Sequence, residues 1–417
     1  MPRADLRGAA AAIGIGQAGI PSGHGRTHLE LLAEAARAAL ADAGHGLRDV
    51  DGLFTTNLVN ATPALTIAEH LGIRPQWIDS TQVGGSSFVH YAISAAAALK
   101  LGLCKVALIV YGSDAGSNGT PPLSRHEFVS HEAEYASPFP ITGAALAAMR
   151  HMKVFGTTRA QLASVAIAAR QWANANPELP AQRPLSLPEL LDAPMVVDPF
   201  TRFDCGQSTD GAGAIVMVAS ERSRDARPPP VYFLGGGTEL SHRRIAEIPD
   251  LTTTAAIGSG ARAFAMAGLG AKDVDVVQLY DGFTIYAIMF LEDLGFCAKG
   301  EGGPFVEAGH TLFGGDLPAN TNGGSLSGVH PGMYGVFQMI EAIVQCRGQT
   351  TGQGCRSGAV SRQRRSSFQS IHRHLGQRED TLKSCKAVDT ASLHAACNDR
   401  RGNVATCKKT MAARKLA

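Results

Sequence analysis

The chain has 417 residues, of which 45% are hydrophobic and 18% charged, and its formal net charge at pH 7 is +2. This composition excludes a disordered protein, and no apolar run reaches the roughly 20 residues that a membrane-spanning helix needs. The eight cysteines have no regular spacing, which favours reduced thiols and a cytoplasmic protein. The length suffices for two or three domains.

The first half of the chain alternates apolar strands with amphipathic helices. The apolar start is predicted to be a buried strand at 10–15 rather than a signal peptide, because an acidic helix at 27–43 follows it. Further elements are expected at 50–55 (strand), 66–71 (helix), 77–82 (extended), 87–101 (helix), 106–111 (strand) and 212–219 (strand). Residues 112–200 interrupt the alternation with helices at about 142–155 and 159–174, and are predicted to form an inserted loop domain over the site.

The second half repeats the plan of the first. In both halves an alanine-rich helix ends at a glycine, Gly44 or Gly268, and an Asp-Val-Asp turn then leads to a short apolar strand. Both halves also carry a Gly-Gly-Ser turn, at 84–86 and 323–325, that is predicted to open another apolar helix. Two copies of this unit predict a duplicated α/β fold with its active site where the copies meet.

The last 68 residues differ from the two halves, which we assign to residues 1–225 and 231–349. Residues 350–417 contain 14 basic and 4 acidic side chains, and half of the cysteines. A basic tail suits nucleic-acid binding. This one has neither helical periodicity nor interleaved aromatic residues, so we expect no nucleic-acid partner.

One glycine motif near the start resembles a dinucleotide-binding pattern. Gly14, Gly16 and Gly19 have the required spacing and follow a strand. However, Pro21 and a Ser-Gly-His-Gly stretch stand where the phosphate-binding helix would begin. The motif therefore does not predict a dehydrogenase.

The most specific chemical motif surrounds His330. This histidine stands between a glycine-rich segment, which includes Asn322, Gly323 and Gly324, and a Pro-Gly-Met-Tyr segment that ends at Tyr334. The pattern predicts an imidazole at a helix start beside open backbone amides, which suits polarising a carbonyl oxygen. A histidine that only caps a helix is the alternative, but the flanking glycines favour catalysis. We therefore predict a catalytic His330 and assign the other four residues to substrate binding.

A second polar motif ends the repeated strand of the second half. Tyr280 and Asp281 follow the apolar run 276–279. Ligands bind at the carboxyl ends of strands in open α/β sheets. A buried tyrosine with a satisfied hydroxyl is the alternative interpretation. We predict that Tyr280 and Asp281 are catalytic.

Longer segments carry a family pattern. They are Asp49-Val-Asp-Gly-Leu, Asp204-Cys-Gly-Gln-Ser-Thr-Asp-Gly-Ala-Gly-Ala, Leu291-Glu-Asp-Leu-Gly-Phe-Cys-Ala-Lys-Gly-Glu-Gly, Asn320-Thr-Asn-Gly-Gly and the His-Pro-Gly-Met-Tyr-Gly block. Together they resemble the thiolase superfamily from about residue 10 to 349, in its sterol-carrier and lipid-transfer branch, whose bacterial members are often labelled acetyl-CoA acetyltransferases. The resemblance implies homodimers with two αβαβα halves and a loop domain, acting on acyl-CoA thioesters. It implies no permanently bound cofactor and no metal, with coenzyme A as part of the substrate.

The sequence departs from this family at the nucleophile. Thiolases carry a catalytic cysteine at the start of the helix where this chain has Gly85, or Gly84 with a one-residue shift. The family's Asn-Glu-Ala-Phe motif is Tyr280-Asp-Gly-Phe here, whereas the family histidine is kept as His330. Claisen chemistry needs a thiolate to take the acyl group. Ser86 is a possible substitute nucleophile, but no base is visible beside it in the sequence, so we assign Gly84, Gly85 and Ser86 to substrate binding.

These departures favour a carbon–carbon lyase over a thiolase. The resemblance to aldolases of steroid side-chain degradation implies a retro-aldol step on a β-hydroxyacyl-CoA, in which His330 and Tyr280 handle the proton and the alkoxide. The thioester carbonyl would lie near the amides of residues 84–87. One catalytic tyrosine of that branch has no clear match, since Tyr334 lies a few residues further along. The branch also uses a small zinc-ribbon and OB-fold partner that binds the coenzyme A end.

Two alternatives stay open. The first is a β-ketoacyl-CoA thiolase, that is, an acetyl-CoA acetyltransferase. The second is a non-catalytic acyl-CoA or lipid-binding protein, which the altered tail favours. Neither the acyl chain nor the choice between thiolysis and retro-aldol cleavage follows from the sequence.

The tail suggests a change of reading frame. The family closes with a glycine-rich loop and a strand of the kind Gly-Asn-Gly-Gly-Val-Leu-Ser. Codons for residues 361–376 can be chosen that encode Ser-Ala-Gly-Asn-Gly-Gly-Val-Leu-Ser-Lys-Ala-Ser-Thr-Val-Ile-Leu in a shifted frame. We hypothesise a frameshift near residues 349–360, which sequencing of the locus tests. The tail is then expected to leave a central strand position empty and to be poorly ordered.

Overall fold

The computed structural model describes residues 6–118, 138–242 and 245–349, with Tyr135 and the short segments 386–389 and 393–397. Its strands are β1 (Ala10–Ala18), β2 (Gly52–Phe54), β3 (Trp77–Asp79), β4 (Val106–Ser113), β5 (Met195–Val197), β6 (Phe200–Thr201), β7 (Gly211–Ala219), β8 (Val231–Gly236), β9 (Val276–Gln278), β10 (Lys386–Asp389) and β11 (Leu393–Cys397). Nine of them form one sheet in the order β3-β2-β4-β7-β1-β8-β11-β10-β9, and β5 pairs with β6 alone. The predicted strands of the first half lie where the sequence places them, within a few residues.

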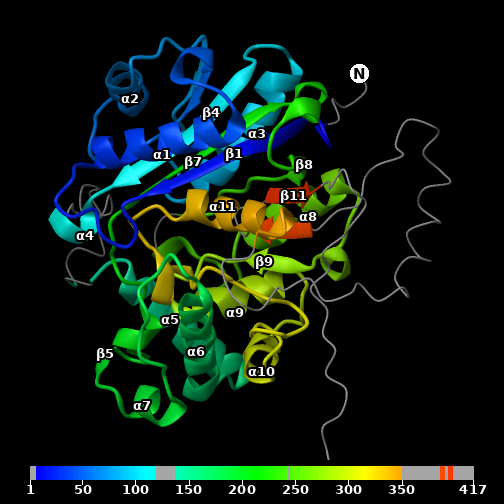
Figure 1. The fold of residues 1–417 in the computed structure, drawn as a ribbon. Coiled ribbons are helices and arrows are strands. Elements are labelled where there is room, and N and C mark those ends of the chain that lie inside the picture. Colours follow the sequence, from blue (N-terminus) through cyan, green and yellow to red (C-terminus); the bar gives the residue numbers. More distant parts are fainter. Residues whose placement is uncertain are drawn as a thin grey trace, which may run out of the picture.

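Helices cover both faces of this sheet (Figure 1). They are α1 (His28–Ala43), α2 (Pro63–Leu71), α3 (Ser86–Lys100), α4 (Ala115–Asn118), α5 (Ile141–Phe155), α6 (Arg159–Ala175), α7 (Leu187–Asp192), α8 (Ala256–Ala267), α9 (Thr284–Asp293), α10 (Gly302–Glu307) and α11 (Gly335–Cys346). Helix α1 packs on β1, β4 and β7, whereas α3 packs on β4 and β7 and contacts α11, which covers β9, β10 and β11. Helix α8 packs on β8. These contacts give the predicted αβαβα layers, with α3 and α11 in the middle.

The structure confirms the internal repeat. Strands β2-β4-β7-β1 of the first half correspond to β9-β10-β11-β8 of the second, with the same order and the same parallel and antiparallel pairs. Gly44 and Gly268 end α1 and α8 in the left-handed conformation, with φ of 72° and 62°. In the turns that follow, Asp49 accepts a hydrogen bond from the Gly46 amide at 2.8 Å, and Asp273 accepts the matching bond at 3.0 Å.

The tail strands correct one expectation. An empty central strand position was predicted because residues 350–417 offer only short apolar runs. That prediction is wrong, since β10 and β11 occupy the position between β8 and β9. Backbone pairing over four or five residues is enough to fill this position in the sheet. Strand β11 pairs with β8, and β10 pairs with β9. The rest of the tail lies outside the described residues.

A second correction concerns the start of α11. The Gly-Gly-Ser turn of the first half opens α3 at Ser86, as predicted. The corresponding turn of the second half instead forms one π-helical turn at Gly324–Gly328, and α11 begins only at Gly335. His330 therefore lies in the connection before α11 and not at a helix start. Pro331, which has no amide donor, and Gly332, with φ of 91°, keep this connection out of helical conformation.

The first two of the three glycines in the dinucleotide-like motif have a packing role. Gly14 and Gly16 lie within β1, so no strand-to-helix turn is present there. A Cβ atom on Gly14 would lie 2.2 Å from the Ala39 carbonyl oxygen, and one on Gly16 would lie 2.4 Å from that of Ala35. Only glycine permits α1 to approach the strand this closely.

The segment between β4 and β7 supplies helices α5, α6 and α7 and the β5–β6 hairpin, which lie together at the lower end of the molecule in Figure 1. A fully buried hydrogen bond joins α5 to α9, where His151 Nε2 lies 3.0 Å from Glu292 Oε2. This contact fixes α5 against the second half of the fold. None of the helices in the described ranges is long and apolar enough to cross a membrane.

Candidate active site

The structure brings together the two polar motifs of the second half. The hydroxyl of Tyr280, just beyond β9, lies 3.4 Å from Nε2 of His330, and their rings are 5.9 Å apart. Both side chains are partly buried. The Tyr280 ring also stacks at 6.0 Å on Tyr286 of α9. The site therefore contains a phenol and an imidazole in contact, held by stacking.

The backbone of His330 is fixed by a residue that the sequence analysis did not single out. The His330 amide donates to Thr209 Oγ1 at 3.0 Å, and the Thr209 amide donates back to the His330 carbonyl oxygen at 3.2 Å. Thr209 belongs to the 204–214 motif, which carried only a family pattern in the sequence. The threonine within that motif was the only sign in the sequence that could have pointed to this role of Thr209.

Burial decides the protonation of this pair. It lowers the pKa of His330 to about 4, and it raises the pKa of Tyr280, to which the nearby Tyr286 and Asp281 also contribute. At neutral pH the imidazole is therefore uncharged and the phenol keeps its proton. The pair contains a proton acceptor beside a proton donor.

Asp281 lies beneath the glycine turn rather than beside the imidazole–phenol contact. It is fully buried, and its Oδ1 accepts a hydrogen bond from the Ser325 amide at 2.7 Å, while Oδ2 has no hydrogen-bond partner. Burial raises its pKa, although hydrogen bonds from Ser325 oppose this. A Cβ atom on Gly324, whose φ is +63°, would lie 1.9 Å from Oδ2. The carboxyl group thus packs against Gly324 and holds the glycine turn through the Ser325 amide.

Asn322 and Tyr334 bond to each other. The Tyr334 hydroxyl donates to Asn322 Oδ1 at 2.8 Å, and the same oxygen accepts the Gly324 amide at 3.0 Å. Tyr334 is 1% exposed and Asn322 is 9% exposed. A Cβ atom on Gly323 would lie 2.7 Å from Cβ of Ala173 on α6. In this structure these residues form the framework of the turn, and substrate contact by them stays a prediction.

The first glycine turn meets the second half at this place. A Cβ atom on Gly85 would lie 3.0 Å from the Tyr334 amide nitrogen, and one on Gly335 would lie 2.3 Å from the Gly85 carbonyl oxygen. Beside it, Gly84 has a φ of +72° and open space, because no atom lies within 4 Å of an added Cβ. Its amide donates to Gln82 Oε1 at 3.1 Å. The N-terminus of α3 therefore faces the segment that contains His330 and Tyr334.

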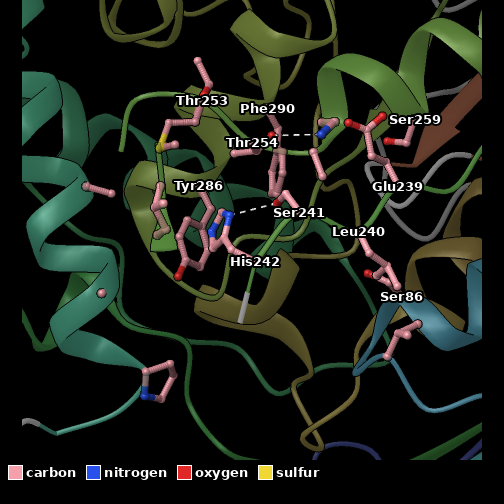
Figure 2. A pocket seen from close by; sticks show the side chains of 18 of the residues that line it. Ser86, Glu239, Leu240, Ser241, His242, Thr253, Thr254, Ser259, Tyr286 and Phe290 are labelled. Carbon is pink, nitrogen blue, oxygen red and sulfur yellow. Dashed lines mark hydrogen bonds between the residues drawn. The ribbon is translucent and has the colours of Figure 1, made fainter. Parts of the chain in front are cut away.

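A cavity of about 710 Å³ extends from this turn (Figure 2). Residues from α3, the start of α5, α9 and the segment 238–259 line it: Val83, Ser86, His90, Phe139, Pro140, Leu240, His242, Thr254, Tyr286, Met289 and Phe290 among others. Most of its lining is apolar, and the described residues around it include no lysine or arginine. Tyr286 connects the cavity to the Tyr280–His330 pair, because it lines the first and stacks on the second.

Three cysteines of the described residues, Cys104, Cys205 and Cys297, are not activated nucleophiles. Burial raises the pKa of Cys104 and Cys297 to about 12 and that of Cys205 to about 11. Cys104 follows the far end of α3, away from the glycine turn. A thiolate is the reactive form of cysteine. Within the described ranges, these three thiols are therefore protonated at neutral pH.

Comparison with known proteins identifies the family. The chain is 32% identical over 370 residues to a steroid side-chain-cleaving aldolase of Thermomonospora curvata, covering 84% of this chain and 93% of that protein. It belongs to the thiolase superfamily. The family model described as thiolase C-terminal domain-like matches residues 237–363, which takes the match 14 residues into the segment 350–417.

A second curated relative and one solved structure are similar to this chain over most of its length. An acetyl-CoA acetyltransferase of Methanothermobacter thermautotrophicus is 32% identical, over 77% of this chain and 86% of that protein. The solved structure of the Ltp2-ChsH2(DUF35) aldolase superposes with a TM-score of 0.78 at 28% identity, covering 95% of this chain and 99% of that one. The predicted thiolase-like fold is thus confirmed.

Proposed function

We propose that this thiolase-superfamily protein is a carbon–carbon lyase that cleaves a β-hydroxyacyl-CoA by a retro-aldol reaction. The observation that carries the proposal is the contact between the neutral His330 imidazole and the protonated Tyr280 phenol. A retro-aldol step needs a proton acceptor and a proton donor but no thiolate. The similarity to the steroid side-chain-cleaving aldolase supports steroid side chains as the substrate class.

In the proposed mechanism the Tyr280–His330 pair removes the proton of the β-hydroxyl group. Its electrons form a carbonyl as the Cα–Cβ bond breaks, which leaves an enolate on the thioester carbon skeleton. Amides at the N-terminus of α3 stabilise the enolate oxygen, because fixed donors there lower the energy of developing negative charge. The pair then returns the proton to Cα. The products are a ketone or aldehyde and a shortened acyl-CoA with its thioester intact.

The cavity described above is proposed to hold the acyl part of the substrate. Its mostly apolar lining suits a steroid or other lipid group. The phosphates of coenzyme A need cations, and the described lining of the cavity offers none. We propose that the coenzyme A end is bound elsewhere, with the aid of a small zinc-ribbon and OB-fold partner. The DUF35 component of the similar Ltp2-ChsH2(DUF35) aldolase supports such a partner.

The proposal also includes a homodimer that works in the cytoplasm, with no permanently bound cofactor. Strand β3 lies at the edge of the nine-stranded sheet, and its Trp77 and Ile78 side chains are 38% and 57% exposed. An uncovered edge strand with apolar side chains favours pairing with a second copy. Among the described residues, Cys104, Cys205 and Cys297 are free thiols, which suits a reducing compartment.

The similarity to an acetyl-CoA acetyltransferase favours one second candidate, β-ketoacyl-CoA thiolysis. Panels of β-hydroxyacyl-CoA and β-ketoacyl-CoA esters, each with and without free coenzyme A, separate the functions. A retro-aldol enzyme releases a carbonyl product from the hydroxy esters without free coenzyme A. A thiolase consumes the keto esters only when free coenzyme A is present. A binding protein converts neither panel.

A further inference from the structure

A serine and a histidine share one face of α3 inside the cavity. Ser86 and His90 are separated by one helical turn, a spacing that places their Cβ atoms about 6 Å apart. Both line the cavity, and Ser86 is exposed to it at the N-terminus of the helix (Figure 2). The sequence showed no base beside Ser86, whereas the helix supplies one.

An aspartate contacts the same imidazole. Asp79, the last residue of β3, has its Oδ2 3.7 Å from His90 Nε2, and the Ser94 hydroxyl lies 3.3 Å from that nitrogen. Asp79 is itself fixed, since its Oδ1 accepts hydrogen bonds from the Thr81 amide at 2.9 Å and hydroxyl at 2.7 Å. Burial raises the pKa of this carboxyl group, but the hydrogen bonds from Ser94 and Thr81 and the nearby His90 outweigh burial and lower it overall. The carboxylate therefore stays ionised, and His90 Nδ1 is the ring nitrogen left to act as a base.

We propose that Ser86, His90 and Asp79 form a second catalytic group, which hydrolyses acyl-CoA thioesters held in the cavity. The substrate class rests on the proposed function, but the reaction does not use the Tyr280–His330 pair. A serine and a histidine one helical turn apart, with a carboxylate beside the imidazole, supply the residue types that acyl transfer through a hydroxyl nucleophile uses.

The proposed reaction has two steps. In the first, Ser86 Oγ forms a bond to the thioester carbonyl carbon while its proton passes to His90. The carbon–sulfur bond then breaks, and coenzyme A leaves as a thiol with the proton from His90. In the second step His90 takes a proton from water, and the resulting hydroxide forms a bond to the acyl carbon of the serine ester. The bond between that carbon and Ser86 Oγ then breaks, His90 returns the proton to Oγ, and the carboxylic acid is released. Asp79 holds the charged imidazole in place and is a positioning residue.

A saturated acyl-CoA without a β-hydroxyl group tests this proposal, because it cannot undergo retro-aldol cleavage. Release of free thiol is followed with a thiol-reactive dye, and the acylated peptide is mapped by mass spectrometry. The wild-type protein is expected to release thiol and to carry the acyl mass on Ser86. Ser86→Ala and His90→Gln should each lower thiol release about 100-fold or more. Ser164→Ala, which removes a serine hydroxyl from α6, should leave it unchanged.

Two results would overturn the proposal: no thiol release by the wild-type protein, or an unchanged rate in Ser86→Ala. The acyl mass on Ser86 is measured in the wild-type protein, so it does not depend on the folding of any variant. Failure of the proposed function has a different readout. It would appear as absence of carbonyl release from β-hydroxyacyl-CoA, whereas thiol release from the saturated ester would be unaffected.

Discussion

The Tyr280 hydroxyl lies 3.4 Å from His330 Nε2, although fifty residues separate them in the chain. Tyr280 follows β9, the last strand in the order of the sheet, and His330 follows the π-helical turn of the glycine-rich segment. Thr209, from the first half of the fold, pairs with the backbone of His330. The pair is thus assembled from three segments that only the duplicated fold brings together.

We expect Asp281 to position the glycine turn and not to take part in the chemistry. The variants Asp281→Asn and Asp281→Ala distinguish these two roles. Asn is isosteric with a neutral carboxyl group and keeps the acceptor for the Ser325 amide. Asp281→Asn should therefore keep kcat within about tenfold of the wild type. Asp281→Ala leaves that amide buried without a partner, at about 1–3 kcal/mol, and should lower both kcat and stability. Equal inactivation of the two variants, with Asp281→Asn still folded, would instead assign the carboxylate to the chemistry.

Much of the fold is predictable because it depends on local patterns. Helices α1 and α8 end at Gly44 and Gly268 as expected, and the Asp-Val-Asp turns follow them. Each of these features depends on only a few neighbouring residues. The location of α11 was not predictable in the same way. The Gly-Gly-Ser turns look alike in sequence, but Pro331 and Gly332 delay the second helix until Gly335.

The site was predictable in its residue types and less so in its contacts. His330 and Tyr280 were chosen from separate motifs, and the structure places them together. Asn322 and Tyr334 were assigned to substrate, but they bond to each other. His90 was missed, because an i, i+4 relation to Ser86 acquires meaning only once the helix face and the cavity are known.

Glu341 makes stability depend on pH. Burial raises the pKa of this carboxyl group to about 7, while Thr321 and Gln345 donate hydrogen bonds to its Oε1 at 2.5 and 2.8 Å. The unfolded chain ionises near its ordinary value of 4.5, so the folded protein binds more protons between about 4.5 and 7. The contribution of Glu341 to the free energy of unfolding is therefore most favourable below pH 4.5, and it is lost as the pH rises through 7.

Glu341→Gln removes this pH dependence and keeps the acceptor oxygen. Its midpoint of thermal unfolding should exceed that of the wild type at pH 8, by a free energy on the order of 3 kcal/mol at most. At pH 4.5 the gain should vanish. Glu221→Gln, at an exposed position, is the control and should show no such dependence. A gain that is equal at both pH values would mean that Glu341 is not the titrating group.

The exposed edge strand β3 predicts where two copies of the chain associate. Replacing Ile78 with Lys places a charge on the exposed edge and should convert a dimer into a monomer. Light scattering after size-exclusion chromatography measures the mass directly. Val154→Lys changes another exposed apolar residue, on α5, and should not alter it. A dimer that survives Ile78→Lys would place the interface elsewhere.

Because β10 and β11 pair within the sheet, we expect their backbone amides to be protected from hydrogen exchange. Amides paired with β8 and β9 exchange slowly, because exchange requires the sheet to open. Hydrogen exchange followed by mass spectrometry should show protection of peptides covering 386–389 and 393–397. Ending the chain at residue 349 should expose β8 and β9 and lower the free energy of unfolding by several kcal/mol. Complete exchange of both peptides within seconds would remove these strands from the sheet.

The most direct test of the account is carbonyl release from a β-hydroxyacyl-CoA without added coenzyme A, measured for the wild type and for His330→Ala. The wild type should release a ketone or aldehyde and leave the thioester intact. Losing the proton acceptor should lower this rate at least about 100-fold. The variant should remain folded by circular dichroism. Carbonyl release at the wild-type rate by His330→Ala, or its absence in the wild type, would contradict the proposed mechanism.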